Sequence, residues 1–127
     1  MDQELLVDGL KALRQKLDQQ YGPVLLLMSL AVDIGIEDWW KLVVSTKGLD
    51  QHSLAEAVHI VADLMRETLP KQVWRSIARV NILRTDDPFV KGMNSWYKAE
   101  DAPLMVQSAT ISGVEIPKAI VLQSKAA

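Results

Sequence analysis

Hydrophobic positions near the start of the chain repeat at helical spacing. Four leucines follow one another at steps of four, three and four residues, at Leu6, Leu10, Leu13 and Leu17. These steps place all four on one side of a helix, so we predict a helix over residues 2–20. Gly22 and Pro23 predict its end, because glycine suits the position after a helix and proline cannot continue one.

An apolar run follows at residues 23–32, with the sequence PVLLLMSLAV. Its length and its lack of polar alternation are typical of a strand that is buried on both faces. Leucine, methionine and alanine also favour helices, and a proline can occupy the first helical position, so a helix is the alternative. Residues 39–46 predict a second strand, and the two strands would form a hairpin.

The pattern at Ser53 and Glu56 indicates the start of a second long helix. A serine followed three residues later by a glutamate forms a capping box, in which each side chain accepts from the other residue's free backbone N–H. Pro70 predicts the end of this helix. Its expected core-facing residues recur at helical spacing and are Leu54, Val58, Val61 and Met65.

The second half of the chain predicts three more strands. Residues 74–84 alternate between apolar and polar positions, with Arg75, Arg79 and Asn81 on one face. Asp87 and Pro88 indicate a turn or a helix start, and residues 88–100 predict short helical turns. Residues 104–112 and 114–123 read as two strands joined by a turn at Ser112–Gly113. Pro117 predicts that the last strand is an edge strand or bulged.

This order, α-β-β-α-β-β-β, predicts one α+β domain over residues 1–127. We expect two layers, with a largely antiparallel sheet and both main helices on one face. The other sheet face would then expose leucine, methionine, valine and tryptophan side chains, and such a patch marks an association surface. A twin subunit, the 85–103 segment or a different protein could cover it.

Composition narrows the class of protein. Of 127 residues, 49% are hydrophobic and 24% charged, which is ordinary for a soluble domain, and the absence of cysteine excludes disulfides and thiolate metal sites. The N-terminus has no basic stretch followed by a cleavage site, and the longest apolar run is too short to cross a bilayer. We therefore expect a cytoplasmic protein with no membrane association.

No pattern predicts catalysis, a cofactor or a metal with any specificity. The scattered glycines form no phosphate-binding loop. His52 and His59 are expected to be solvated. A small metal-dependent enzyme is the second alternative: loop carboxylates at Asp33, Asp38, Asp86 and Asp87 could hold a divalent cation if their loops met. The simpler interpretation is that these aspartates stabilise turns and cap helices.

Charge is distributed unevenly along the chain and suggests the first alternative function. The net charge is −2, but residues 1–63 carry −5 and residues 64–127 carry +3. Arg75, Arg79, Arg84 and Lys91 could bind an anion or, with a nearby tryptophan, single-stranded nucleic acid. Pairing of these cations with acids of the first half is the competing explanation.

Four tryptophans, against two tyrosines and one phenylalanine, are the unusual feature of the composition. Trp39 and Trp40 are neighbours, so in a strand they point to opposite faces. Tryptophan is enriched at the centres of protein interfaces. We therefore predict a non-enzymatic interaction module, self-associating or a subunit of a larger assembly, which binds protein through Trp39, Trp40 and Trp96.

Overall fold

The computed structural model describes residues 3–32, 39–100 and 102–126. The fold of this part is α+β, as predicted. Its helices are α1 (Gln3–Tyr21), α2 (Leu54–Thr68), α3 (Lys71–Ser76) and α4 (Pro88–Trp96), with a 3-10 turn, η1, at Lys47–Leu49. Its strands are β1 (Val24–Ala31), β2 (Trp40–Thr46), β3 (Ile77–Ile82), β4 (Leu104–Ile111) and β5 (Val114–Ser124).

The five described strands form one sheet in the order β3-β2-β1-β5-β4. The predicted hairpin of β1 and β2 is confirmed, but the sheet is mixed and not largely antiparallel, because β3 runs parallel to β2. The cause is the connection between them. Helices α2 and α3 carry the chain back along the sheet before β3 begins, and such a crossover joins parallel strands.

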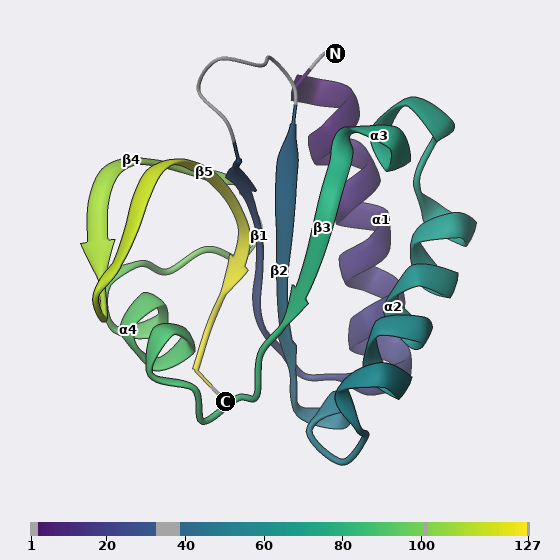
Figure 1. Ribbon diagram of the computed structural model, residues 1–127, viewed down its shortest axis with the longest axis horizontal. Coiled ribbons are helices and arrows are strands. Elements are labelled where there is room, and N and C mark those ends of the chain that lie inside the picture. The colour runs from purple at the N-terminus through teal and green to yellow at the C-terminus, as the bar shows by residue number, and fades with distance from the viewer. Residues whose placement is uncertain (1–2, 33–38, 101, 127) are drawn as a thin grey trace.

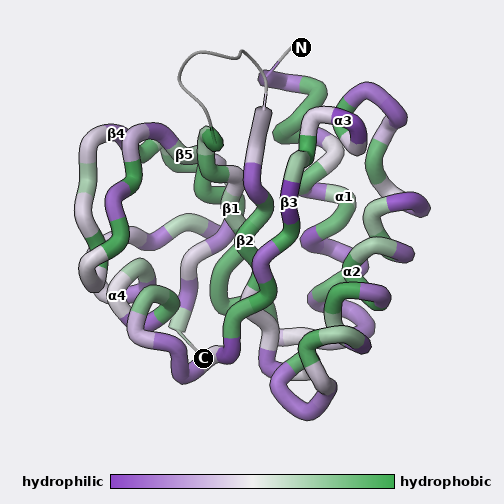
Figure 2. Tube along the Cα trace, viewed as in Figure 1, coloured by the Kyte–Doolittle hydropathy of each residue, from purple (hydrophilic) through white to green (hydrophobic). Residues whose placement is uncertain are grey.

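The apolar run at the centre of the sheet is a strand, and the helical alternative is wrong. Every residue from Val24 to Ser29 is buried. Leu27 packs on the side of α1, whereas Met28 packs on the side of α4. The run lacks polar alternation because both faces of β1 are covered. Figure 2 shows hydrophobic positions concentrated in these central strands.

Both faces of the sheet carry helices, so the predicted two-layer arrangement is wrong. On one face α1 and α2 pack as predicted, and the short α3, which follows α2, lies on the same face. The four leucines of α1 are fully buried there. On the other face the β4–β5 hairpin curls around α4, which contributes Phe89, Val90 and Met93 to a second core (Figure 1). The expected open apolar face is therefore covered by the chain itself, through α4 within the 85–103 segment.

The predicted strand over residues 74–84 is wrong in its first part. Pro70 precedes α3, whose Val73 is fully buried, and the Ser76 hydroxyl donates to the Val73 carbonyl oxygen at 2.7 Å. Trp74 and Arg75 are therefore helical, and only residues 77–82 form a strand. The alternation of apolar and polar residues in that strand continues backwards into α3, and a helix of six residues is too short to show a helical period of its own.

The Ser112–Gly113 turn is confirmed, with φ angles of 49° and 80°. Of the two alternatives predicted from Pro117, the edge strand is wrong, because β5 lies between β1 and β4. The register of β5 against β1 does shift, between Gln123 and Val121. Pairing of β5 with β1 begins only at Ala119, so Pro117 has a described neighbour on one side only. Its missing N–H is thus accommodated in an internal strand.

Two close backbone approaches fix the connection around α1. The Asp18 carboxylate accepts from the Val24 N–H at 2.9 Å and links the end of α1 to β1. Gly48 in η1 lies so near Tyr21 that an added Cβ would be 2.4 Å from the Tyr21 carbonyl oxygen. Within the described ranges, no helix is both long and apolar enough to span a membrane.

Candidate functional site

The tryptophans do not form one contact surface. Trp40 is only 5% exposed and belongs to the core under α1 and α2, with the Lys118 ammonium 5.8 Å from its ring centroid. Trp39, at 42%, and Trp96, at 75%, are exposed. Trp96 ends α4, across the sheet from α2. Trp40 therefore stabilises the fold, and the prediction that it offers contact surface is wrong.

The four cations predicted to bind an anion lie on four different segments. Arg75 is on α3, Arg79 on β3, Arg84 just after β3 and Lys91 on α4, and all four are exposed. Because Arg75 is helical, it does not share the strand face of Arg79 and Asn81. Arg84 is already engaged, since its Nε lies 3.3 Å from Asp86 and its Nη1 donates to the Asp50 carbonyl oxygen at 3.1 Å.

The carboxylates proposed for a metal have other contacts where they are described. Asp87 is the N-cap of α4 and accepts from the Phe89 N–H at 2.8 Å, as its sequence context predicts. Asp86 pairs with Arg84. Asp33 and Asp38 lie outside the described residues. The described residues contain no cluster of three or more metal-binding side chains.

The exposed edge of the sheet at β3 is the first component of the candidate site. β3 is a terminal strand of the sheet, lies in front of β2 in Figure 1, and has no drawn element in front of it. Leu83 N–H donates to the Val44 carbonyl oxygen at 2.9 Å, towards β2. Because backbone groups alternate along a strand, those of Val80 and Ile82 point the other way, out of the sheet.

The second component is an apolar stripe on α2. The residues that face the core are Ala57, Val61, Leu64 and Met65. Of the predicted core face, Val61 and Met65 are buried, but Leu54 is 66% exposed and Val58 37%. The prediction failed at these two positions because apolar residues surround more than half of this helix, and two stripes fit the same period. Leu54 and Val58 are one turn apart and form a surface strip.

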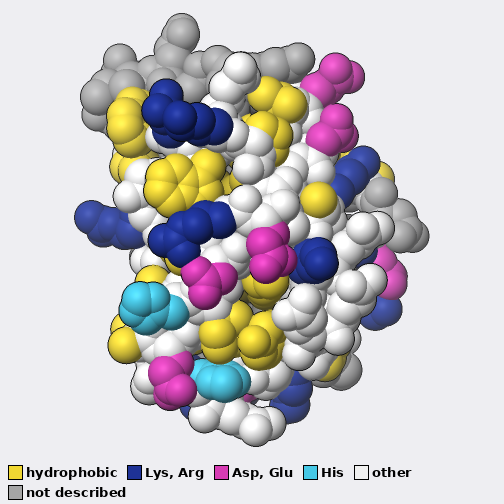
Figure 3. Space-filling view, turned by 90° about the vertical axis from the view of Figure 1, so that its right-hand side faces the viewer, with side chains coloured by type: hydrophobic (Ala, Val, Ile, Leu, Met, Phe, Trp, Pro, Cys, Tyr) yellow, Lys and Arg dark blue, Asp and Glu magenta, His cyan; other side chains and the backbone are white. Residues whose placement is uncertain are grey.

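A hollow of about 280 Å³ lies between the start of α2 and the end of β3. Its apolar lining comes from Leu49, Leu54, Ala57, Ile82 and Leu83, with Asp50, His52 and Arg84 contributing polar groups. Figure 3 views the α2 and α3 side, where hydrophobic side chains reach the surface near both histidines. The hollow therefore joins the exposed leucine of α2 to the open edge of β3.

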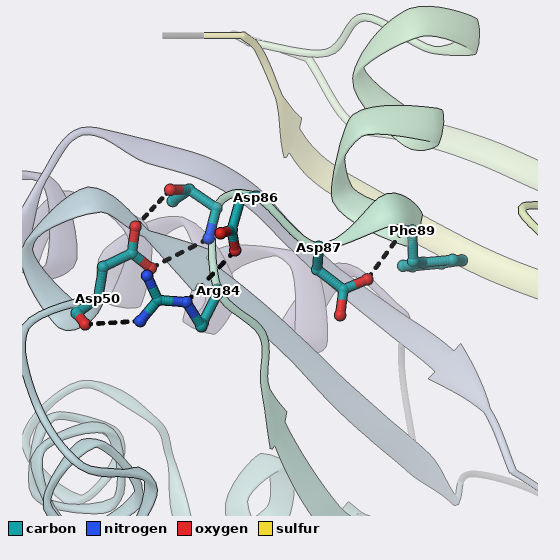
Figure 4. Close-up of polar contacts among 6 residues, drawn as sticks. Asp50, Arg84, Asp86, Asp87 and Phe89 are labelled. Atoms are coloured by element: carbon teal, nitrogen blue, oxygen red, sulfur yellow. Dashed lines mark hydrogen bonds and ion pairs between the residues drawn. The ribbon is translucent and has the colours of Figure 1, made fainter.

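Asp50 fixes the shape of this hollow. Its carboxylate accepts from the Thr85 N–H at 3.0 Å and from the Thr85 hydroxyl, while its carbonyl oxygen accepts from Arg84 (Figure 4). These bonds join the turn before α2 to the segment after β3. Two walls of the hollow are thereby linked across 35 residues of sequence.

The predicted capping box is confirmed and fixes the first turn of α2. The Ser53 hydroxyl accepts from the Glu56 N–H, and the Ser53 N–H donates to Glu56 Oε1, both at 3.2 Å. These bonds from Ser53, with a smaller contribution from His52, lower the pKa of Glu56 below its ordinary value of 4.5. His52 Nδ1 lies 3.9 Å from Glu56, and its ring meets Tyr21 edge-on.

A larger hollow, of about 420 Å³, lies at the end of β5, but its polar groups serve the fold. Asn94 donates to the Leu25 carbonyl oxygen at 3.0 Å and to the Ser124 hydroxyl at 3.1 Å. The Ser124 hydroxyl donates to the Tyr97 carbonyl oxygen at 2.9 Å. These groups hold the end of β5 against α4, so the hollow offers few polar groups to a ligand.

Sequence reasoning therefore did not identify the surface formed by β3 and α2. One signal was available, namely the excess of apolar residues on α2 over what a single core face needs. The position of β3 at the edge of the sheet had no local signal, since it depends on which strands pair. The chain matches no family model, no curated protein and no solved structure.

Proposed function

We propose that this protein is an interaction module that binds another polypeptide, as a subunit of a larger assembly, through the β3–α2 surface. We define this surface as the outer backbone edge of Val80–Ile82 together with the side chains of Leu54, Val58 and Ile82. The observation that carries the proposal is the exposure of Leu54 and Val58 beside a strand edge. An apolar strip and an unpaired edge are both features that natural proteins usually cover.

The contacts around the surface support a binding role. The wall formed by Asp50, Thr85 and Arg84 holds the hollow open without help from a ligand. The capping box likewise fixes the first turn, which carries Leu54. A preorganised surface loses less conformational entropy on binding than a mobile one. The exposed tryptophans Trp39 and Trp96 remain secondary candidates for contacts of the same assembly.

Site-specific photo-crosslinking tests this proposal. A photoreactive amino acid replaces Leu54 in one sample and the exposed Val114, at the start of β5, in the matched control, and both are irradiated in the cells that make the protein. We expect a discrete adduct from position 54 that disappears when Val58→Asp is added. Adducts of equal yield from both positions, or none from position 54, would contradict the proposal. An adduct of twice the chain's mass would indicate self-association.

A further inference from the structure

We infer that the partner binds the β3–α2 surface as an extended acidic segment of another protein, which adds to β3 as a sixth strand. This inference rests on the proposed function and specifies the kind of partner. Three properties of the surface carry it: the direction of the backbone groups of β3, the hollow beside them and the charge of the surrounding segment.

The backbone edge selects an extended strand. The N–H and C=O groups of Val80 and Ile82 point away from β2, as the bond from Leu83 to Val44 requires. Among the described residues, no backbone or side-chain group from outside the sheet hydrogen bonds to them. Only another extended backbone presents donors and acceptors at the spacing that satisfies both residues.

The hollow accommodates side chains of the added strand. Neighbouring strands lie about 4.8 Å apart, and every second side chain of the added strand would point towards α2. Leu54 and Ile82 line the hollow on that side. An aliphatic side chain at such a position would cover the exposed Leu54, so apolar residues are expected at alternate positions of the partner.

The charge of the surrounding segment favours acidic residues at the other positions. Residues 68–85 contain four basic residues and no acidic one. Arg79 is exposed on the sheet face away from α2 and pairs in register with Lys41, so two cations lie side by side. Neither Arg75 nor Arg79 forms an ion pair with a described residue. Carboxylates on the outward side of the added strand would compensate this charge.

The same charge argues against a second copy of this chain. An antiparallel pair of β3 strands, related by a twofold axis, would bring the basic segments of two copies together, with Arg79 and Arg84 of each close to those of the other. Like charges directly opposite each other in a sheet are destabilising. The acids closest to the hollow are already engaged, Asp50 with Thr85 and Asp86 with Arg84.

The test uses proline as an edge-blocking residue. Val80→Pro removes an outward N–H and leaves the hydrogen bonds to β2 in place, because a proline is tolerated where its N–H would face away from the sheet. Val80→Ala is the matched control, since it loses a similar part of the side chain and keeps the N–H. Circular dichroism and thermal melts establish that both variants are folded before binding is measured.

A displayed library of random dodecapeptides is selected on the wild-type protein, and affinities of the enriched peptides are measured by fluorescence polarisation. We expect acidic residues to alternate with β-branched or aliphatic ones. We expect Val80→Pro to weaken binding at least about tenfold and Val80→Ala by less than about threefold, as the loss of a main-chain hydrogen bond and steric blocking predict. Arg79→Gln should weaken binding about twofold to fivefold.

Amide hydrogen exchange gives an independent measurement. The N–H groups of Val80 and Ile82 should exchange rapidly in the free protein and slowly with an enriched peptide bound. Strand addition is overturned if no peptide is enriched, or if the enriched peptides bind Val80→Pro and Val80→Ala equally.

If the peptides bind Val80→Pro as tightly as the wild type but bind Leu54→Asp more weakly, strand addition is wrong and the interaction function is still supported. Salt-sensitive binding of a single-stranded oligonucleotide that survives Val80→Pro, with no peptide enriched, would overturn the inference in favour of an anion site. Failure of the crosslinking experiment as well would remove the interaction function itself.

Discussion

Replacing Asp50 by alanine tests whether the wall beside the hollow is a structural link. The change leaves the half-buried Thr85 N–H, now 3.0 Å from the Asp50 carboxylate, without its acceptor, and removes the partner of the Thr85 hydroxyl. An unsatisfied, partly buried donor costs about 1–3 kcal/mol. We therefore expect the free energy of unfolding to fall by about 2 kcal/mol, and the urea midpoint by about 1 M for a slope near 2 kcal/mol/M.

Asp86→Ala is the matched control. It removes a second aspartate that contacts the same arginine, but this pair is exposed, and such ion pairs contribute about 0–1 kcal/mol. A double-mutant cycle of Asp50→Ala with Thr85→Val should give a coupling energy of at least about 0.5 kcal/mol. Equal losses for the two aspartate variants, or additive effects of Asp50→Ala and Thr85→Val, would refute the assignment of the link to Asp50.

Three further predictions concern the fold around the site. Trp40→Ala should reduce the free energy of unfolding by about 3–5 kcal/mol in urea titrations, whereas Trp96→Ala should change it by less than about 0.5 kcal/mol; comparable losses would contradict their placement. Gly48→Ala should lower the free energy of unfolding by about 1–3 kcal/mol, because the added Cβ would meet the backbone of Tyr21. A melting temperature equal to that of the wild type would exclude this contact. In an NMR titration the Glu56 carboxylate should have a pKa below 4.5. The capping box is then intact above that pH and is lost as the pH falls through the lowered pKa. A pKa at or above 4.5 would count against the capping box.

Local signals in the sequence were enough to predict the elements whose formation depends on near neighbours. The leucine stripe of α1, the capping box at Ser53 and the Ser112–Gly113 turn each act within a few residues. The run at β1 was identified because burial on both faces removes polar alternation. These predictions needed no knowledge of which strand lies beside which.

Predictions that depended on long-range pairing failed. The sheet was expected to be largely antiparallel because consecutive strands usually pair, but the α2–α3 crossover makes β3 parallel to β2. The position of β5 between β1 and β4 could not be read from Pro117, since the proline lies beyond the part of β5 that pairs with β1.

The candidate site was misplaced for a related reason. The excess of tryptophan in the composition predicted a contact surface at these residues, but Trp40 is in the core and Trp96 lies on the far side of the sheet from α2. What distinguishes the β3–α2 surface is the combination of an unpaired backbone edge with Leu54 and Val58, and no single stretch of sequence contains both. Which strand lies at the edge is a property of the finished sheet and is not fixed by the residues of that strand alone.

The central place of β5 has a consequence for how the protein is made. The Gln123 side chain donates to the Val24 carbonyl oxygen, although the two residues are 99 positions apart in the sequence. The strands that carry them, β5 and β1, are paired in the sheet. During synthesis on the ribosome, β1 and β2 emerge long before this partner, so β1 has an unpaired edge and an apolar sequence until residues 119–124 have been translated as well. Such a segment is prone to aggregate and is the kind of sequence that chaperones bind. Late completion of the sheet thus makes the nascent chain most vulnerable at its own first strand.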